Sequence, residues 1–144
     1  MTKKRNNFKV LFFNSDLDTL PFSVALQPYI TRTSTINAWT TRQLVRKLEL
    51  YIEEDVDNTV ARAIDDLLEY PETFNISIDM IDTNGISQGG VVFFECKPVE
   101  VVLNAFDSKF NSLVEQNILG DFGDEAVTNR LTIQYETFKR KPKI

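Results

Sequence analysis

Two pairs of neighbouring carboxylates are the residues of this chain whose type could support acid–base chemistry. One pair is Glu53 with Glu54, and the other is Asp65 with Asp66. General acid–base catalysis requires both carboxyl groups to reach the same substrate atom. Adjacent residues on a strand or a helix point in different directions, so neither pair converges on one atom. The spacing therefore argues against a carboxylate active site.

The composition excludes several other kinds of site. The sequence has no histidine, which removes Ser-His-Asp and Cys-His catalysis together with the usual zinc sites. No glycine pattern fits a P-loop or a dinucleotide-binding turn. A calcium loop at Asp82–Gly85 would need ligands at Met80 and Val91, so this segment is interpreted as a turn. We predict that the protein is not an enzyme and has no catalytic residues, no metal ligands and no cofactor.

The spacing of apolar residues predicts a chain made mainly of β-strands. We expect short strands at Phe8–Phe13 and Pro21–Leu26, and a long strand at Gln43–Asp55. Pro28 marks a bend, because proline cannot donate a ladder hydrogen bond. The polar stretch Thr31–Thr41 is expected to be a long loop or a pair of extended arms.

A single helix is predicted at Asp57–Tyr70, where the apolar spacing becomes helical. Asp57 or Asn58 can cap its start by accepting hydrogen bonds from first-turn amides. Pro71 ends it, because the residue before a proline is pushed out of helical geometry. The expected buried stripe consists of Val56, Val60, Ile64, Leu67 and Leu68, and the opposite face carries Asp65, Asp66 and Glu69.

A β-hairpin at Thr73–Lys97 follows the helix. The Asn84-Gly85 pair tolerates the positive φ angles of a tight turn, and Gly89-Gly90 predicts a bulge. The first strand alternates, with its apolar face formed by Phe74, Ile76, Ile78 and Met80. A charge placed at Ile76 is therefore expected to abolish folding, whereas a charge at Ser77 is expected to be tolerated.

The remaining elements complete one domain over residues 1–144, with flexible basic termini at about 1–7 and 139–144. We expect a short helix at Lys109–Asn117 and a last strand at Val127–Phe138. No apolar run approaches the roughly 20 residues of a membrane-spanning helix, and no secretory signal is expected. The lone Cys96, among apolar neighbours, is expected to be a buried thiol in a reducing cytoplasm.

Charge is segregated along the chain. Between Glu49 and Asp82 there are eleven acidic residues and one base, a net charge of −10 within a total of −5, so the rest of the chain carries +5. Basic tails on an acidic body can bind nucleic acid or a membrane surface, or can simply be solvated ends. In a protein that assembles with itself, the opposite charges can instead pair between copies.

Five segments occur in an order that resembles the tail tube proteins of contractile-tailed bacteriophages and of contractile injection systems. They are Leu44–Glu54, Asn58–Leu68, Phe74–Gly85, Phe94–Val101 and Leu131–Phe138. In that family a long strand precedes a covering helix, a hairpin ends in an aromatic-x-Pro-x-x-Val type of motif, and a late strand alternates Leu/Ile with an aromatic. Here Lys97 precedes Pro98 where the family has an aromatic residue, and the connection Asp107–Ala126 is longer.

The resemblance implies a β-sandwich or barrel of the phage tail tube type, mainly β with one covering α-helix. Six subunits would close into a ring, and stacked rings would form the hollow tail tube through which the phage genome passes. An acidic lumen would repel DNA and would be lined by Ser77, Asp79, Gln134 and Glu136. Contacts between subunits and rings would come from Thr31, Trp39, Thr41, Phe110 and Asp121, although Trp39 can equally fold back onto the core.

The partners implied are other copies of the chain, tail sheath proteins and baseplate proteins, with DNA as a transiting cargo and no membrane. The protein would be made in the host cytoplasm and located in the virion tail. Unpaired strand edges, which readily pair with another chain, are the physical basis of this assembly. Two alternatives stay open: a tube initiator or terminator on the same fold, and a small acidic cytoplasmic binding module whose basic tails bind nucleic acid.

Overall fold

The computed structural model describes residues 8–40, 43–103 and 127–142, and within these ranges the side chains of 31–45 and 103 are not described. In chain order the elements are β1 (Phe8–Phe13), α1 (Pro21–Leu26), the 3₁₀ turn η1 (Gln27–Tyr29), β2 (Ile30–Thr40), β3 (Gln43–Glu53), α2 (Thr59–Leu68), β4 (Phe74–Ile81), β5 (Ser87–Leu103), β6 (Thr128–Gln134) and β7 (Thr137–Lys141). The fold is therefore mainly β, as the alternating segments predict. Two helices accompany the strands in the described ranges, not one.

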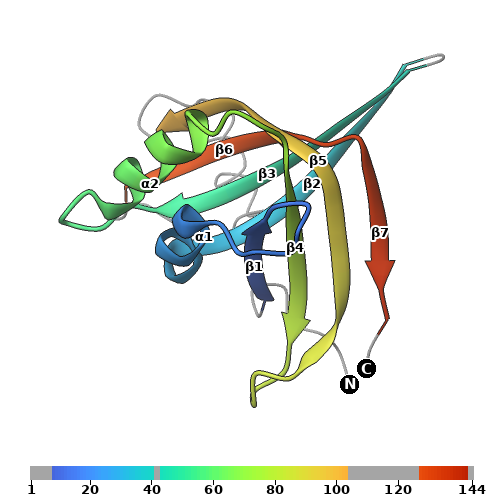
Figure 1. Cartoon of the computed structure of the whole chain (residues 1–144), viewed down its shortest axis with the longest axis horizontal. Helices are drawn as coiled ribbons and strands as arrows, with labels where there is room; N and C mark the ends of the chain where they lie inside the picture. The colour runs from blue at the N-terminus through green and yellow to red at the C-terminus, as the bar shows by residue number, and fades with distance from the viewer. Residues whose placement is uncertain (1–7, 41–42, 104–126, 143–144) are drawn as a thin grey trace, which may run out of the picture.

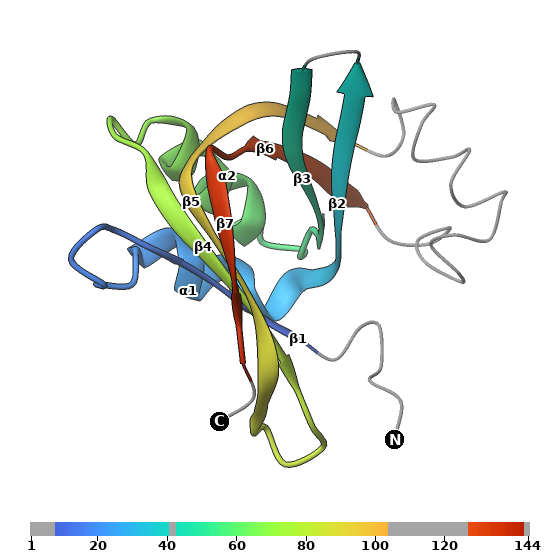
Figure 2. The ribbon, with the colours of Figure 1, turned by 90° about the vertical axis from the view of Figure 1, so that its right-hand side faces the viewer.

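One antiparallel sheet runs through the molecule in the order β1-β4-β5-β6-β3-β2, with β7 also paired to β5 (Figure 1). The long strand β5 belongs to two parts of the sheet. Its first part, up to Cys96, pairs with β4 and β7, and its second part, from Lys97, pairs with β6. We call β1, β4, the first part of β5 and β7 the first half-sheet, and the second part of β5 with β6, β3 and β2 the second half-sheet. Figures 1 and 2 show that the strands of the two halves run in different directions.

The sheet bends where β5 passes from one half to the other. Phe74 pairs with Cys96 and Ile76 with Phe93, so two residues of β5 lie opposite Asn75 alone. One of these two is Glu95, whose φ of 53° lies in the left-handed region. Its amide donates to Asn75 Oδ1 at 3.2 Å. Bulges of this kind bend a strand and increase its twist.

The segment that pairs with the other edge of β5 is interrupted near the same bulge. The predicted strand Val127–Phe138 is in fact two strands, β6 and β7, separated by Tyr135 and Glu136. The amide of Glu136 donates to the carbonyl of Phe94 at 3.1 Å, which joins the two interruptions. The single-strand prediction was wrong because alternation along one strand does not report a bulge in its neighbour.

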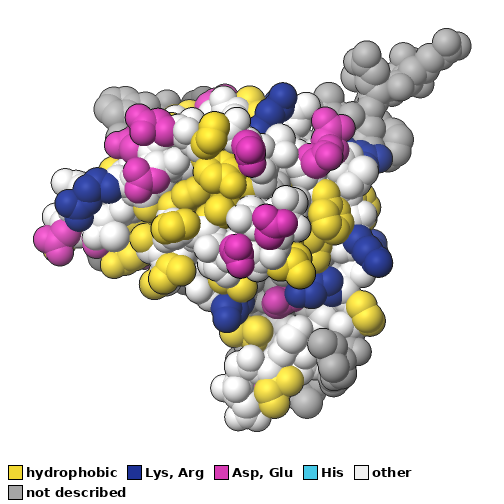
Figure 3. Space-filling view, in the orientation of Figure 1, with side chains coloured by type: hydrophobic (Ala, Val, Ile, Leu, Met, Phe, Trp, Pro, Cys, Tyr) yellow, Lys and Arg dark blue, Asp and Glu magenta, His cyan; other side chains and the backbone are white. Residues whose placement is uncertain are grey.

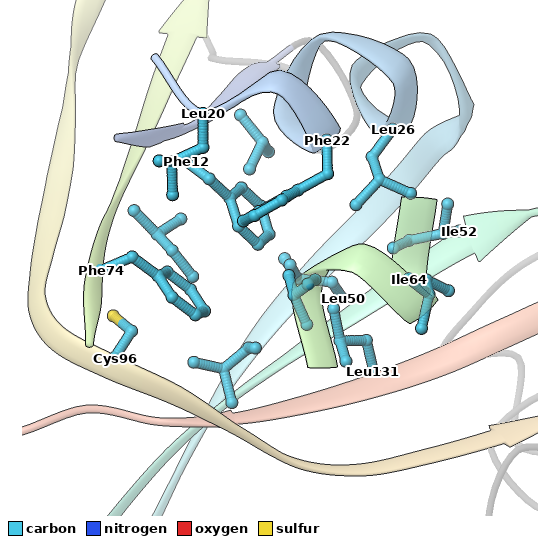
Figure 4. Close-up of a cluster of buried hydrophobic side chains, with 14 of the residues drawn as sticks. Phe12, Leu20, Phe22, Leu26, Leu50, Ile52, Ile64, Phe74, Cys96 and Leu131 are labelled. Carbon is cyan, nitrogen blue, oxygen red and sulfur yellow. The ribbon is translucent and has the colours of Figure 1, made fainter. Parts of the chain in front are cut away.

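The core lies between the inner faces of the two half-sheets and under α1 and α2 (Figure 4). The rings of Phe12 and Phe74 stack with centroids 5.4 Å apart, and Phe22 meets Phe12 edge-on at 5.6 Å. The second half-sheet contributes Leu48, Leu50, Ile52, Leu131 and Ile133, all with no exposed surface. Of the predicted apolar face of β4, Phe74 and Ile76 are buried, whereas Ile78 and Met80 are only partly buried.

The segment Pro21–Leu26 is the helix α1 and not the predicted strand. Proline suits the first helical turn because its missing N–H would have no partner there. Phe22, Ser23 and Leu26 are buried, whereas Val24 is 64% exposed, contrary to an alternating face. Ser23 Oγ also accepts a hydrogen bond from the Phe12 amide at 2.7 Å. Over six residues, helical and alternating spacing both fitted the sequence, and packing against β1 decided between them.

The stretch interpreted as a loop, Thr31–Thr41, is largely the strand β2, which ends at Thr40. Its backbone pairs with β3 from Ile30↔Ile52 to Thr40↔Gln43, so the extended-arm alternative was the better description. This β2–β3 hairpin projects well beyond the body of the molecule (Figure 1). Its threonines and β-branched residues suit a strand that has a long partner to pair with.

Helix α2 is capped by residues that precede the expected caps. Asp55 Oδ1 accepts from the Thr59 amide at 2.6 Å, and the two Glu54 oxygens accept from the amides of Val60 and Ala61 at 3.1 Å. Asn58 occupies the cap position with a φ of 58° and makes no side-chain cap hydrogen bond. Val56, expected in the buried stripe, is 97% exposed because the helix begins only at Thr59. Val60, Ile64 and Leu67 are buried as predicted, but Leu68, also expected in the stripe, is 49% exposed.

Because of this cap, the stability of the fold should depend on pH. Hydrogen bonds from Thr59 hold the pKa of Asp55 below its ordinary value. The native carboxylate therefore binds its proton more weakly than the unfolded one, so its stabilisation is present above about pH 4 and is lost as the pH falls through the lowered native pKa. We expect Asp55→Asn to be less stable than wild type at pH 7 and to lose less further stability on acidification. Chemical denaturation of both proteins between pH 7 and pH 3 measures this, and parallel pH profiles would contradict it.

The β4–β5 hairpin confirms the predicted turn. Gly85 has a φ of 78°, and Asp82 Oδ1 accepts from the amides of Asn84 and Ile86, both at 2.9 Å. The predicted bulge is also present, since Asp79 pairs with Gly90 but Ile81 pairs with Ser87. The predicted helix Lys109–Asn117 lies outside the described residues.

Candidate interaction surfaces

Open strand edges are the most evident feature for a binding role. Among the described residues, β2 pairs only with β3, and β7 pairs only with β5. The edge of β1 is partly covered by its own chain, because the Leu20 amide donates to the Phe12 carbonyl at 2.8 Å and Phe13 forms a bridge with Thr19. The expectation that open backbone edges would be available to other copies therefore holds best for β2 and β7.

The polar side chains of β4 form a cluster with the end of the chain. Lys141 Nζ lies 2.6 Å from Asp79 Oδ1 and donates to Ser77 Oγ at 3.1 Å. Lys141, Gly90 and Asp79 occupy one row across β7, β5 and β4, so the lysine side chain passes over a glycine to reach the carboxylate. These contacts connect β7 to β4 across β5.

A groove of about 330 Å³ lies beside this cluster, with apolar walls from Leu11, Phe13, Leu17 and Val92. A serine and a lysine at hydrogen-bonding distance can form a catalytic pair when the lysine accepts the serine proton. Here the Nζ of Lys141 donates to both partners and neutralises Asp79, so it is not placed to act as a base. The cluster is therefore a structural ion pair.

A second charged network lies on the other face of the second half-sheet. Arg130 Nη1 is 3.5 Å from Glu49 Oε1, and its Nη2 is 3.1 Å from Glu100 Oε1. Tyr51 OH donates to the second Glu49 oxygen at 2.6 Å. Glu49, Tyr51 and Arg130 are buried, although they alternate with the core residues of β3 and β6. This network could not be predicted from the sequence, because the alternation of β3 and β6 predicts a solvated face for Glu49, Tyr51 and Arg130.

The four residues predicted to share a lumen surface do not lie together. Ser77 and Asp79 are on the outer face of the first half-sheet, where Ser77 is only 7% exposed beneath Lys141. Ser77 is therefore not on a fully solvated face, and the tolerance of a charge at this position stays a prediction. Gln134 ends β6 beside Lys47 and Lys97, and the exposed Glu136 lies in the bend before β7.

The predicted contact residues fall mostly outside the described parts of the chain. Thr31 and Trp39 lie on β2, but only their backbone is described. Thr41, Phe110 and Asp121 are not among the described residues, nor is the connection Asp107–Glu125. Their contact roles stay predictions.

The basic C-terminal segment is not a free tail. Residues 139–141 belong to β7, and only the positions after 141 extend beyond it. This corrects the predicted terminus at about 139–144 and weakens the idea of a basic tail that binds nucleic acid. Cys96 is fully buried as predicted, and burial raises the pKa of its thiol to about 12.

Several solved structures share this fold. A chain of the sheath–tube complex of PVC, an extracellular contractile injection system, superposes with a TM-score of 0.61 at 11% identity, covering 98% of this chain and 92% of that chain. A chain of the tube-terminating cap of the anti-feeding prophage gives 0.60 at 11% identity, with coverage of 99% and 92%. The Hcp1 protein of E. coli EAEC 042 gives 0.58 at 9% identity, with coverage of 94% and 90%. No protein-family model and no curated protein matches the sequence.

These similarities confirm the predicted fold of the tail tube type over nearly the whole chain. The neighbours come from sheath–tube, cap and baseplate assemblies, which are structural complexes. At identities of 9–12%, these similarities establish the fold but not the role of any residue.

Within the described residues, no helix is long and apolar enough to cross a membrane. In the same residues, no group of three or more potential ligands could hold a metal ion.

Proposed function

We propose that this protein is the structural subunit of a tail tube, in which copies close into rings of six and the rings stack into a hollow tube. The observation that carries the proposal is a fold shared over at least nine-tenths of both chains with components of contractile injection systems. The edges of β2 and β7 that have no second strand among the described residues support it, because closing a ring of copies pairs edges that otherwise invite aggregation. The expected partners are sheath and baseplate proteins, and the expected cargo is DNA.

The projecting β2–β3 hairpin supports a contact role for one of the residues predicted there. The outer end of its backbone runs far from the core, so it is in a position to reach another copy (Figure 1). We propose that the outer end of this hairpin, where Trp39 pairs with Leu44, contacts the next ring. Thr31 lies at the other end of β2, next to Ile30, which pairs with Ile52, so the projection gives no support to its predicted contact. Gln134 and the exposed Glu136 are the better candidates for the lumen, because Ser77 and Asp79 are occupied by Lys141.

Electron microscopy of the purified protein over a range of concentrations tests the proposal. We expect rings with sixfold symmetry, and tubes of stacked rings at the highest concentration. Sedimentation velocity on the same samples should show discrete large species in place of a broad aggregate. A protein that stays monomeric at every concentration would contradict the proposed function.

A tube initiator or terminator is the second candidate. It is favoured by the equally good superposition on a chain of the anti-feeding prophage cap and on a chain of the PVC sheath/tube terminator complex, the latter with a TM-score of 0.61. The two roles differ in copy number. A tube subunit should be among the most abundant proteins of purified particles, whereas an initiator or terminator should be present in one or a few rings.

A further inference from the structure

We infer that successive copies of this chain meet through two complementary patches, the basic strand β7 of one copy and the acidic face of helix α2 of the next. This inference rests on the proposed function, since it names a contact by which the copies assemble. The basic patch is the open edge of β7, where Phe138 and Arg140 lie on one face of the strand and Lys139 on the other. The acidic patch is Asp65, Leu68 and Glu69.

The basic patch lies on an open edge. Phe138, Lys139 and Arg140 are all exposed, and Phe138 keeps 46% of its surface accessible. Among the described residues neither Lys139 nor Arg140 has an ion-pair partner, whereas the next residue, Lys141, is already paired with Asp79. The outer backbone edge of β7 also lacks a paired strand in the described ranges.

The acidic patch lies on one stripe of α2. Leu68 and Glu69 follow Asp65 by three and four residues, so Asp65 and Leu68 lie on one side of α2 and Glu69, its C-cap, lies on the same side. All three are exposed, with Leu68 at 49%, while the buried stripe of the same helix faces the core. Asp66 and Glu72 add exposed acidic groups beside it, and Arg62 one turn earlier is the only base in the helix. Figure 3 shows acidic side chains over this part of the molecule.

The two patches match in composition and in position. Each has an exposed apolar side chain beside charges of one sign, the arrangement of an interface with an apolar centre and a polar rim. Helix α2 and strand β7 lie at opposite sides of the body in Figure 1, so one copy cannot bring them together. A contact between different patches of identical copies runs head to tail, and it closes into a ring when the rotation allows. This also gives a function to the segregation of charge along the sequence.

Charge reversal tests the inference directly. Lys139→Glu with Arg140→Glu, and separately Asp65→Lys with Glu69→Lys, should each raise the concentration needed for ring formation about tenfold or more, since two ion pairs become two repulsions. The four substitutions in one chain restore opposite signs and should assemble within about threefold of wild type. A one-to-one mixture of the two double variants should also form rings, because each supplies the patch that the other lacks. Wild-type assembly should weaken with rising salt.

The control reverses acids of the same type elsewhere. Asp16→Lys with Asp18→Lys changes two exposed residues of the turn after β1 and should leave assembly unchanged. Circular dichroism of every variant excludes misfolding as the cause. If wild type forms rings and both patch variants form them equally well, the inference is wrong while the proposed function stands. If wild type forms no ring at all, both are wrong.

Discussion

Replacing Ile76 by aspartate should leave the protein unfolded at room temperature. Ile76 has no exposed surface and lies at the centre of β4, in the core cluster between Phe12 and the inner face of β5. A carboxylate there would lose its hydration without gaining a partner. The expected cost is at least about 4 kcal/mol, most of the stability of a small domain. Far-ultraviolet circular dichroism and urea denaturation measure it.

Asn75→Asp is the matched control for this experiment. It adds the same charged group one residue earlier on the same strand, but on the opposite face. The wild-type Oδ1 accepts the hydrogen bond of the Glu95 amide, and an aspartate oxygen can do the same. We expect its stability within about 1 kcal/mol of wild type. Equal damage from both substitutions would contradict the burial pattern of β4. Ser77, the control that the sequence suggested, is unsuitable because it lies beneath Lys141.

Gly90→Ala should be strongly destabilising. A Cβ atom at this position would overlap the backbone carbonyl oxygen of Ile78 and crowd the Asp79 Cα. Neither atom can rotate away, so β4 and β5 would have to separate locally. The same shift would disturb the row in which Lys141 reaches Asp79. We expect a loss of about 3 kcal/mol in the free energy of unfolding, measured by chemical denaturation.

Gly85→Ala separates this steric effect from the general cost of losing a glycine. Gly85 has a φ of 78° in the hairpin turn, but a Cβ added there meets no atom within 4 Å. The expected cost is therefore only backbone strain, about 1 kcal/mol. If Gly85→Ala cost as much as Gly90→Ala, close approach of the strands would not be the reason for a glycine at position 90.

Several elements of the fold could be predicted from the periodicity of apolar residues in the sequence. Strand β3, three of the five residues in the expected buried stripe of α2, and the β4–β5 hairpin with its Gly85 turn could be predicted, because each segment is long enough to show its spacing. Short or locally ambiguous segments could not. Pro21–Leu26 fits a helix or a strand equally well in isolation, and its helix is selected by contacts of Phe22 and Ser23 with Phe12.

The candidate surfaces depended even more on tertiary structure. The sequence by itself determined the composition of the two charged regions, the lack of histidine chemistry and the alternation that makes a sheet with one apolar face. Only the fold decided that the bulge at Glu95 bends β5, that Lys141 crosses Gly90 to neutralise Asp79, and that β7 and α2 lie on opposite sides. The physical reason is that periodicity reports which face of a segment is buried. Which distant segments meet, and which charges stay free for another copy, is set by long-range packing.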